Sequence, residues 1–284
     1  MGTLTHRKHE SRQLAWTAPV LFALLLIAAW WLVTAFADIE SWVFPSPQAF
    51  VRAAGQLLTE SWFWQRVAIT AGEALAGAFL GTVVAIPLAW VIYRSSIVRA
   101  AIEPFLGATQ AIPAIALAPL LVLWIGHGFV AIVTLCALMV FFPVLVSTVV
   151  GLRGLDPDVL DAAAIDGADG LRLTWSVEMP MAAPIVLAGI RNGFTLSVTG
   201  AVVGEMVMGG TGLGQALAQQ RYNLDTAGMF VTVGVLCLLA MTLYSLIYSV
   251  ERRIKRDTRP KNRYRTASAE PQTDSASQGD RNAR

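Results

Sequence analysis

The chain has 284 residues, of which 55% are hydrophobic and 14% are charged, with a formal net charge of only +2. Soluble domains average about 25% charged residues, so this composition indicates a membrane protein. None of the three lysines follows a glycine-rich phosphate-binding loop, which excludes a Walker A motif on this chain.

Six apolar runs predict six membrane-spanning helices. The first run is too long for the core of a signal peptide and has no clear cleavage site, so we interpret it as a retained span. The third run contains Pro113 and Pro119, which predict kinks that neighbouring helices make tolerable. Residues 1–13 precede the spans, and the polar residues 254–284 after them are predicted to be disordered. The predicted spans are residues 14–36, 67–93, 101–125, 129–150, 183–208 and 226–250.

The shorter connections carry turn signals. Pro45 and Pro47 on either side of Ser46 predict a turn followed by a short helix. Four glycines within residues 209–214 predict a tightly turned loop. No lysine follows them at a helix start, so they do not indicate a phosphate site. Both cysteines lie in apolar runs, where we expect packing residues and neither a disulfide nor a metal site.

The longest polar interruption begins at Asp156 and carries five aspartates. Asp156 followed by Pro157 is typical of a helix N-cap with proline at the first helical position. Gly167 stands where a left-handed residue would end this helix. A second short helix is predicted from Leu171 to Glu178, and Met179-Pro180 is predicted to end it.

Basic residues predict the orientation in the membrane. Six spans place both termini on one side, and cytoplasmic connections carry an excess of Lys and Arg. One side holds most of the basic residues: Arg7, Lys8, Arg12, Arg94, Arg99, Arg153, Arg172 and those from Arg252 onward. The other side holds Arg52, Arg66 and Arg221. Both termini and the aspartate-rich connection are therefore predicted to be cytoplasmic.

The aspartate-rich connection resembles a known family motif. Asp161-Ala162-Ala163 precedes Gly167, which lies six positions after the acid, and Met179-Pro180 ends thirteen positions after that glycine. This spacing is similar to the cytoplasmic EAA loop of permease subunits of bacterial ABC importers, with Asp for Glu and Met for Leu. In that family the loop docks into a groove of the ATPase. The resemblance thus assigns ATPase coupling to Asp161, Ala162, Ala163, Gly167, Met179 and Pro180.

Further stretches resemble the branch of this family that imports sulfonates, taurine, nitrate and pyrimidine precursors. They include QAIPAIALAPLLVLWIGHG at residues 110–128 and VVGEMVMGGTGLG at residues 202–214. The resemblance implies an all-α membrane protein with six transmembrane helices, a type I ABC importer permease fold and both termini cytoplasmic. The transmembrane permease domain would cover residues 14–253, with a coupling loop at about 156–180.

The resemblance also implies partners. We expect two ATPase subunits, a second permease copy in a homodimer, and an extracytoplasmic substrate-binding protein, assembled in the bacterial plasma membrane. ATP and Mg²⁺ would belong to the ATPase, so we expect no catalytic residue, cofactor, metal or nucleic acid on this chain. The expected substrate is a small anion such as a sulfonate, taurine or nitrate. The alternative is a pyrimidine or thiamine precursor or another heterocyclic vitamin.

Glu73, Arg191 and Glu205 lie within predicted spans, where ionisable residues are candidates for function. Glu205 either contacts the solute path or reaches water at the interface. Arg191 either neutralises an anionic substrate or pairs with Glu73 or Glu205. Two rival classes of protein remain. An ion-coupled secondary transporter would have to use the same three residues, and no inverted repeat is visible. A membrane enzyme would need a nucleophile or a metal cluster in a span, and the sequence offers neither.

Overall fold

The computed structural model describes residues 6–36, 40, 42–109 and 113–257. Over these ranges the chain forms helices joined by short connections, with no β-strand. The helices, in order, are α1 His6–Phe36, α2 Pro47–Leu57, α3 Ser61–Arg94, α4 Ser96–Thr109, α5 Ala114–Ile125, α6 Phe129–Arg153, α7 Pro157–Ile165, α8 Gly170–Leu173, the π-helical turn η1 Thr174–Glu178, α9 Met179–Met208, α10 Leu213–Tyr222 and α11 Thr226–Asp257.

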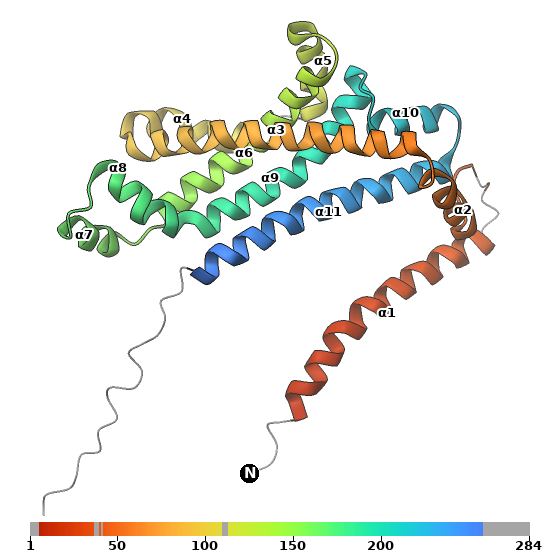
Figure 1. The fold of residues 1–284 in the computed structure, drawn as a ribbon, viewed down its shortest axis with the longest axis horizontal. Helices are drawn as coiled ribbons and strands as arrows, with labels where there is room; N and C mark the ends of the chain where they lie inside the picture. Colours follow the sequence, from red (N-terminus) through yellow and green to blue (C-terminus); the bar gives the residue numbers. More distant parts are fainter. Residues whose placement is uncertain (1–5, 37–39, 41, 110–112, 258–284) are drawn as a thin grey trace, which may run out of the picture.

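Four helical segments of the described chain are long and apolar enough to cross a membrane: Ser61–Arg94, Phe129–Arg153, Gly170–Met208 and Thr226–Ser249. They correspond to the second, fourth, fifth and sixth predicted spans. Helices α3, α6, α9 and α11 form one bundle, with α7 and α8 at one end and α2 and α10 at the other (Figure 1). The apolar parts of α1 and α5, Leu21–Phe36 and Ile115–Ile125, are shorter.

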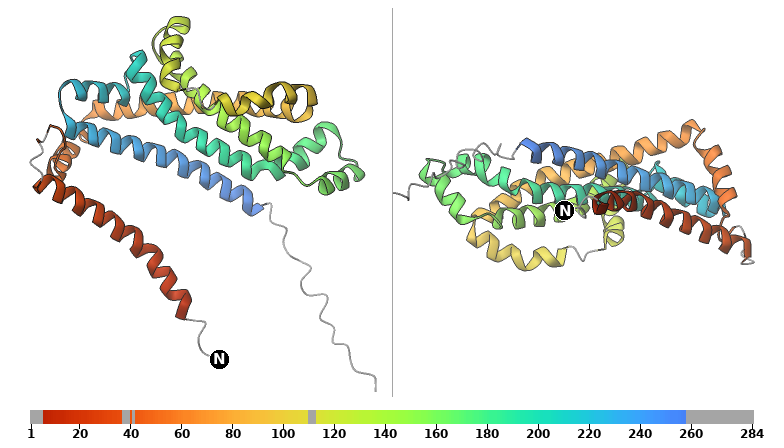
Figure 2. Two further views of the ribbon diagram at one scale, coloured as in Figure 1. Left: turned by 180° about the vertical axis from the view of Figure 1, so that it is seen from behind. Right: turned by 90° about the horizontal axis from the view of Figure 1, so that it is seen from below.

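The third predicted span is not one continuous helix. Helix α4 runs along α3, whereas α5 turns away from that direction (Figures 1 and 2). Pro113 precedes α5 with an extended backbone, φ −69° and ψ 119°. Proline has no N–H for the helical ladder and disfavours helical geometry in the residue before it. The kink predicted at Pro113 is therefore a break in the helix, whereas Pro119 lies inside α5.

Close backbone contact holds the centre of the bundle together, because small residues face their neighbours. A β-carbon on Gly81 of α3 would lie 2.5 Å from the Ala137 carbonyl oxygen of α6. One on Gly193 of α9 would lie 2.8 Å from Val140 Cγ1, also on α6. Small residues allow membrane helices to approach in this way. Helix α6 is thus packed between α3 and α9.

The end of the bundle near α2 is organised by a cap and an aromatic cluster. The Ala49 N–H donates to Ser46 Oγ (3.2 Å), and Pro47 opens α2, which confirms the predicted turn and short helix. Trp30 of α1 stacks on Phe230 of α11 with ring centroids 6.1 Å apart. From this cluster α1 diverges from the bundle (Figure 2).

Helix α11 continues to Asp257, past the predicted start of the tail at residue 254. Likewise, α1 begins at His6, within the segment expected to precede the first span. The predicted disorder was therefore wrong for residues 254–257, and the rest of the predicted tail, residues 258–284, lies outside the described residues.

The glycine contacts predict a specific loss of stability. Gly81→Ala should destabilise the protein by about 1–3 kcal/mol, because the new methyl group meets a backbone oxygen that cannot move without separating α3 from α6. Gly72→Ala in the same helix is the matched control, since nothing lies within 4 Å of its β-carbon position. Both changes raise helix propensity equally, so thermal unfolding in detergent isolates the packing effect. Equal melting temperatures for the two variants would contradict it.

Candidate functional site

The aspartate-rich connection, which the sequence predicts to be cytoplasmic, begins with a capped helix, α7. Asp156 Oδ1 accepts a hydrogen bond from the Asp158 N–H (3.0 Å), and Pro157 opens α7. At the other end of α7, the Gly167 N–H donates to the Ala164 carbonyl and the Ala168 N–H to the Ala163 carbonyl, both at 3.0 Å. These two bonds form a Schellman motif.

Gly167 sets the turn after α7. Its φ of +84° lies in the left-handed region, as predicted, and no atom lies within 4 Å of its β-carbon position. Glycine is therefore required here by backbone conformation and not by lack of space. Gly170, which the sequence interpretation did not single out, also has a positive φ of +49°. Two left-handed residues thus direct the chain from α7 into α8.

The helix that begins at Gly170 does not end at Met179-Pro180. Helix α8 passes through the π turn η1 into α9, and the Met179 N–H donates to the Thr174 carbonyl five residues back. The wider turn shifts the hydrogen-bond register ahead of Pro180, which lacks an N–H and would crowd the carbonyl of an ordinary α-turn. The predicted helix end was therefore wrong, and Gly170–Met208 is one helical segment. We call residues 157–178 the platform.

A buried carboxylate connects the platform to α3. Glu178 is 1% exposed. Its Oε2 accepts a hydrogen bond from the Thr174 hydroxyl (2.8 Å), and its Oε1 accepts one from the Tyr93 hydroxyl (3.3 Å). Arg94 Nη2 lies 3.6 Å from Glu178 Oε2. Residues at the end of α3 therefore satisfy a charge that the platform buries.

Arg94 and Trp90 extend this connection to the rest of the platform. Arg94 Nη2 donates to the Gly170 carbonyl and to Thr174 Oγ1, both at 3.0 Å. Trp90 Nε1 donates to the same hydroxyl at 3.2 Å. The sequence interpretation missed this network, although an arginine at the end of one span and a glutamate within a helical pattern beside the next were visible signals.

The platform exposes large apolar side chains. Ile165, Leu171 and Trp175 are 86%, 64% and 70% exposed. Asp161 and Ala162 are exposed beside them, and Ala163 is half-buried. Of the last two predicted coupling residues, Met179 is half-buried and Pro180 is exposed. Large exposed apolar side chains among polar residues are typical of a protein-binding surface.

Glu205 is fully buried and holds α10 against the bundle. Its Oε1 accepts a hydrogen bond from the Thr70 hydroxyl, and its Oε2 accepts one from the Gly214 N–H, both at 2.6 Å. The Leu213 N–H donates to Thr70 Oγ1 (2.8 Å). Two free N–H groups at the start of α10 are thus satisfied by α3 and α9. A β-carbon on Gly212 would collide with these same groups, which explains a glycine there.

The other two charged candidates lie apart from each other. Glu73 is 2% exposed and its carboxyl group neighbours that of Glu205. Arg191 instead donates to Glu251 Oε2 of α11 (3.1 Å) and stacks over the Tyr244 ring. The expected pairing of Arg191 with Glu73 or Glu205 was wrong. At 1.5 Å per residue, Arg191 and Glu205 are about 21 Å apart along α9.

These features agree with the similarity of the chain to known proteins. The family described as "Binding-protein-dependent transport system inner membrane component" matches residues 77–256. The riboflavin transport system permease protein of Chloroflexus aurantiacus is 35% identical over 253 residues, covering 88% of this chain and 94% of the relative. The formylaminopyrimidine transport permease protein of Halalkalibacterium halodurans is 31% identical over 233 residues, covering 82% and 92%.

The similarity extends to a more distant relative and to a solved structure. The taurine transport system permease protein of Escherichia coli is 26% identical over 267 residues, covering 89% of this chain and 97% of the relative. A chain of the MetNI methionine ABC transporter in an inward-facing conformation superimposes with a TM-score of 0.61. That likeness covers 68% of this chain and 95% of the other at 18% identity, so it shows the fold alone. This chain therefore belongs to the binding-protein-dependent transport system inner membrane components, and it is a permease component of an ABC importer.

Proposed function

We propose that this chain forms part of the solute path and receives the force of ATP hydrolysis from a separate ATPase through the platform. The observation that carries this proposal is the combination of an exposed apolar face with a buried connection to the spans. Ile165 and Trp175 offer a surface for the partner. Glu178 and Arg94 join that surface to α3. A displacement of the platform is therefore passed to two long helices.

Helices α3 and α9 are connected at both ends. Thr70 and Glu205 join them near α10, and Arg94 and Glu178 join them at the platform. Thr70 and Arg94 are about 36 Å apart along α3 at 1.5 Å per residue. Helices α3 and α9 thus act as one rigid body across the bundle. Glu205 affects the solute path by holding α10, and Glu73 lies beside it, whereas Arg191 braces α9 against α11.

The proposed assembly contains a second copy of this chain, two ATPase subunits and an extracytoplasmic substrate-binding protein. ATP and Mg²⁺ bind to the ATPase, and this chain holds no cofactor. The excess of basic residues on the platform side supports a cytoplasmic platform with both termini on that side. Six spans result if α1 and the α4–α5 segment each cross the plasma membrane.

For the substrate, the similarity favours a heterocyclic compound over a small anion. Two relatives above 30% identity are described as transporting riboflavin and formylaminopyrimidine, whereas the taurine permease is 26% identical. We therefore propose a heterocyclic vitamin or precursor as the solute class and retain sulfonates, taurine and nitrate as the second candidate.

Replacement of Gly167 tests the coupling role. Gly167→Val should leave the protein in the membrane yet abolish ATPase co-purification and uptake into reconstituted vesicles, because a β-branched residue is strained at positive φ. Gly167→Asn is the matched control, since asparagine tolerates the left-handed region and should preserve most of the uptake. Riboflavin and taurine serve as the two solute probes.

Wild-type uptake by Gly167→Val would show that the platform is not the coupling element. Uptake that continues without the ATPase but collapses when the ion gradient is dissipated would instead establish an ion-coupled carrier.

Removal of the buried carboxylate should separate ATPase binding from transport. Glu178→Ala removes the ion-pair partner of Arg94 and the acceptor of the Tyr93 and Thr174 hydroxyls. Substrate-stimulated ATPase activity should fall about tenfold or more, since a hydrogen bond to a charged group contributes about 1.5–3 kcal/mol. The ATPase should still co-purify because the exposed face is intact. Asp169→Ala, an exposed acid of the platform without a capping bond, is the control and should retain stimulation. Equal activity in the two variants would refute the connection.

The role of Glu205 can be decided by paired substitutions. Glu205→Gln retains an acceptor for the Gly214 N–H and a partner for Thr70, so transport should persist. Glu205→Ala removes both hydrogen bonds and should increase amide hydrogen exchange in α10 by about tenfold. A loss of transport in Glu205→Gln with unchanged exchange would indicate direct contact with the solute instead.

A further inference from the structure

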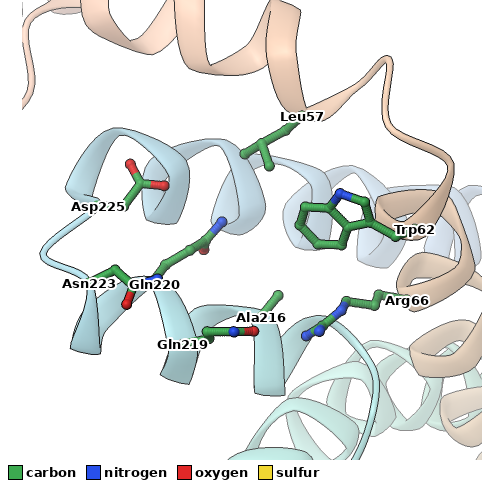
Figure 3. A pocket seen from close by; sticks show the side chains of 8 residues that line it. All are labelled: Leu57, Trp62, Arg66, Ala216, Gln219, Gln220, Asn223 and Asp225. Carbon is green, nitrogen blue, oxygen red and sulfur yellow. The ribbon is translucent and has the colours of Figure 1, made fainter.

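A polar pocket of about 380 Å³ opens at the end of the bundle opposite the platform (Figure 3). Its walls come from the end of α2, the first turns of α3, helix α10 and the residue before α11. The pocket shares no lining residue with the platform or with the Glu73–Glu205 cluster. It is therefore separate from the coupling function proposed above.

One wall of the pocket is cationic. The Arg66 guanidinium lies over the Trp62 ring, 5.3 Å from its centroid. Arg66 Nη1 is buried and has no hydrogen-bond partner within the described part of the chain. A buried donor without an acceptor is costly, and native structures rarely leave one unmatched. Arg66 is thus poised to receive an anionic oxygen.

The facing wall is anionic. Asp225 Oδ1 accepts a hydrogen bond from the Gly228 N–H (2.9 Å), while its second oxygen has no partner among residues 6–36, 40, 42–109 and 113–257. Figure 3 shows Asp225 and Arg66 on opposite sides of the pocket, with Gln220 between them. Gln220 is 7% exposed, its Oε1 accepts from the Thr232 hydroxyl (3.0 Å), and its Nε2 is unpaired within the described structure.

We propose that this pocket binds a small zwitterionic group, with its anion at Arg66 and its ammonium at Asp225. A ligand that carries both charges matches the two charged walls together, and Gln220 between them supplies a neutral hydrogen-bond donor. The volume is that of a small-molecule site. Two sources offer this chemistry: a free aminosulfonate or amino acid, and the phosphoethanolamine headgroup of a membrane lipid. Trp62 in the pocket wall suits a membrane interface, where aromatic residues meet headgroups.

Two binding measurements on the full-length protein, purified with its associated subunits, distinguish the sources. In dodecyl maltoside, which is uncharged, calorimetry compares 2-aminoethanesulfonate with ethanesulfonate and ethylammonium, which each lack one charge. In nanodiscs of equal phosphatidylethanolamine and phosphatidylglycerol, native mass spectrometry identifies the retained lipid. We expect either tighter binding of 2-aminoethanesulfonate than of both single-charge probes, or selective retention of phosphatidylethanolamine.

Substitutions in the pocket test whether the ligand binds there. Arg66→Gln and Asp225→Asn should each weaken it about tenfold or more, because each removes a charge-assisted hydrogen bond. Asparagine keeps the acceptor at the start of α11, so the fold is preserved. Arg221→Gln is the matched control, since Arg221 is exposed on α10 outside the pocket and should leave binding unchanged. The proposal fails if neither the calorimetry nor the mass spectrometry shows binding, or if a single-charge probe binds as tightly as 2-aminoethanesulfonate. It also fails if Arg221→Gln weakens binding as much as Arg66→Gln and Asp225→Asn do.

Discussion

The close approach of α3 and α9 to α6 is the constraint on which the other features depend. Glycines such as Gly81 and Gly193 bring backbones into contact where a β-carbon would not fit. In a membrane the hydrophobic effect does not drive helices together, so van der Waals packing and hydrogen bonds must do so. Only at this separation do side chains of α3 reach the polar groups of α9 and α10.

Polar groups buried within this bundle are satisfied by connections between distant parts of the chain. Glu205 lies in α9, yet its partners come from α3 and the start of α10. Glu178 precedes α9 and is satisfied by the last turn of α3. A buried charge is expensive unless it is paired or hydrogen-bonded. Each of these carboxylates therefore fixes the position of a neighbouring element, α10 in one case and the platform in the other.

The π turn explains how the platform and the spans behave as one body. A helix that ended at Pro180 would leave a flexible joint between the platform and α9. The turn at Thr174–Glu178 instead carries the hydrogen-bonded backbone past the proline. It also places Thr174 and Glu178 on the side that faces α3. Single π turns are often found at functional sites, where an altered register re-aims side chains.

The sequence by itself determined the local features and the membrane class. The cap at Asp156 and the left-handed turn at Gly167 depend on a few neighbouring residues, and the long apolar runs of α3, α6, α9 and α11 depend on composition alone. The tertiary structure decided what involves separate segments. It split the third span at Pro113, carried the helix past Pro180 and paired Arg191 with Glu251. It also joined Arg94 to Glu178, because partners distant in sequence are selected only when close helix packing brings them together.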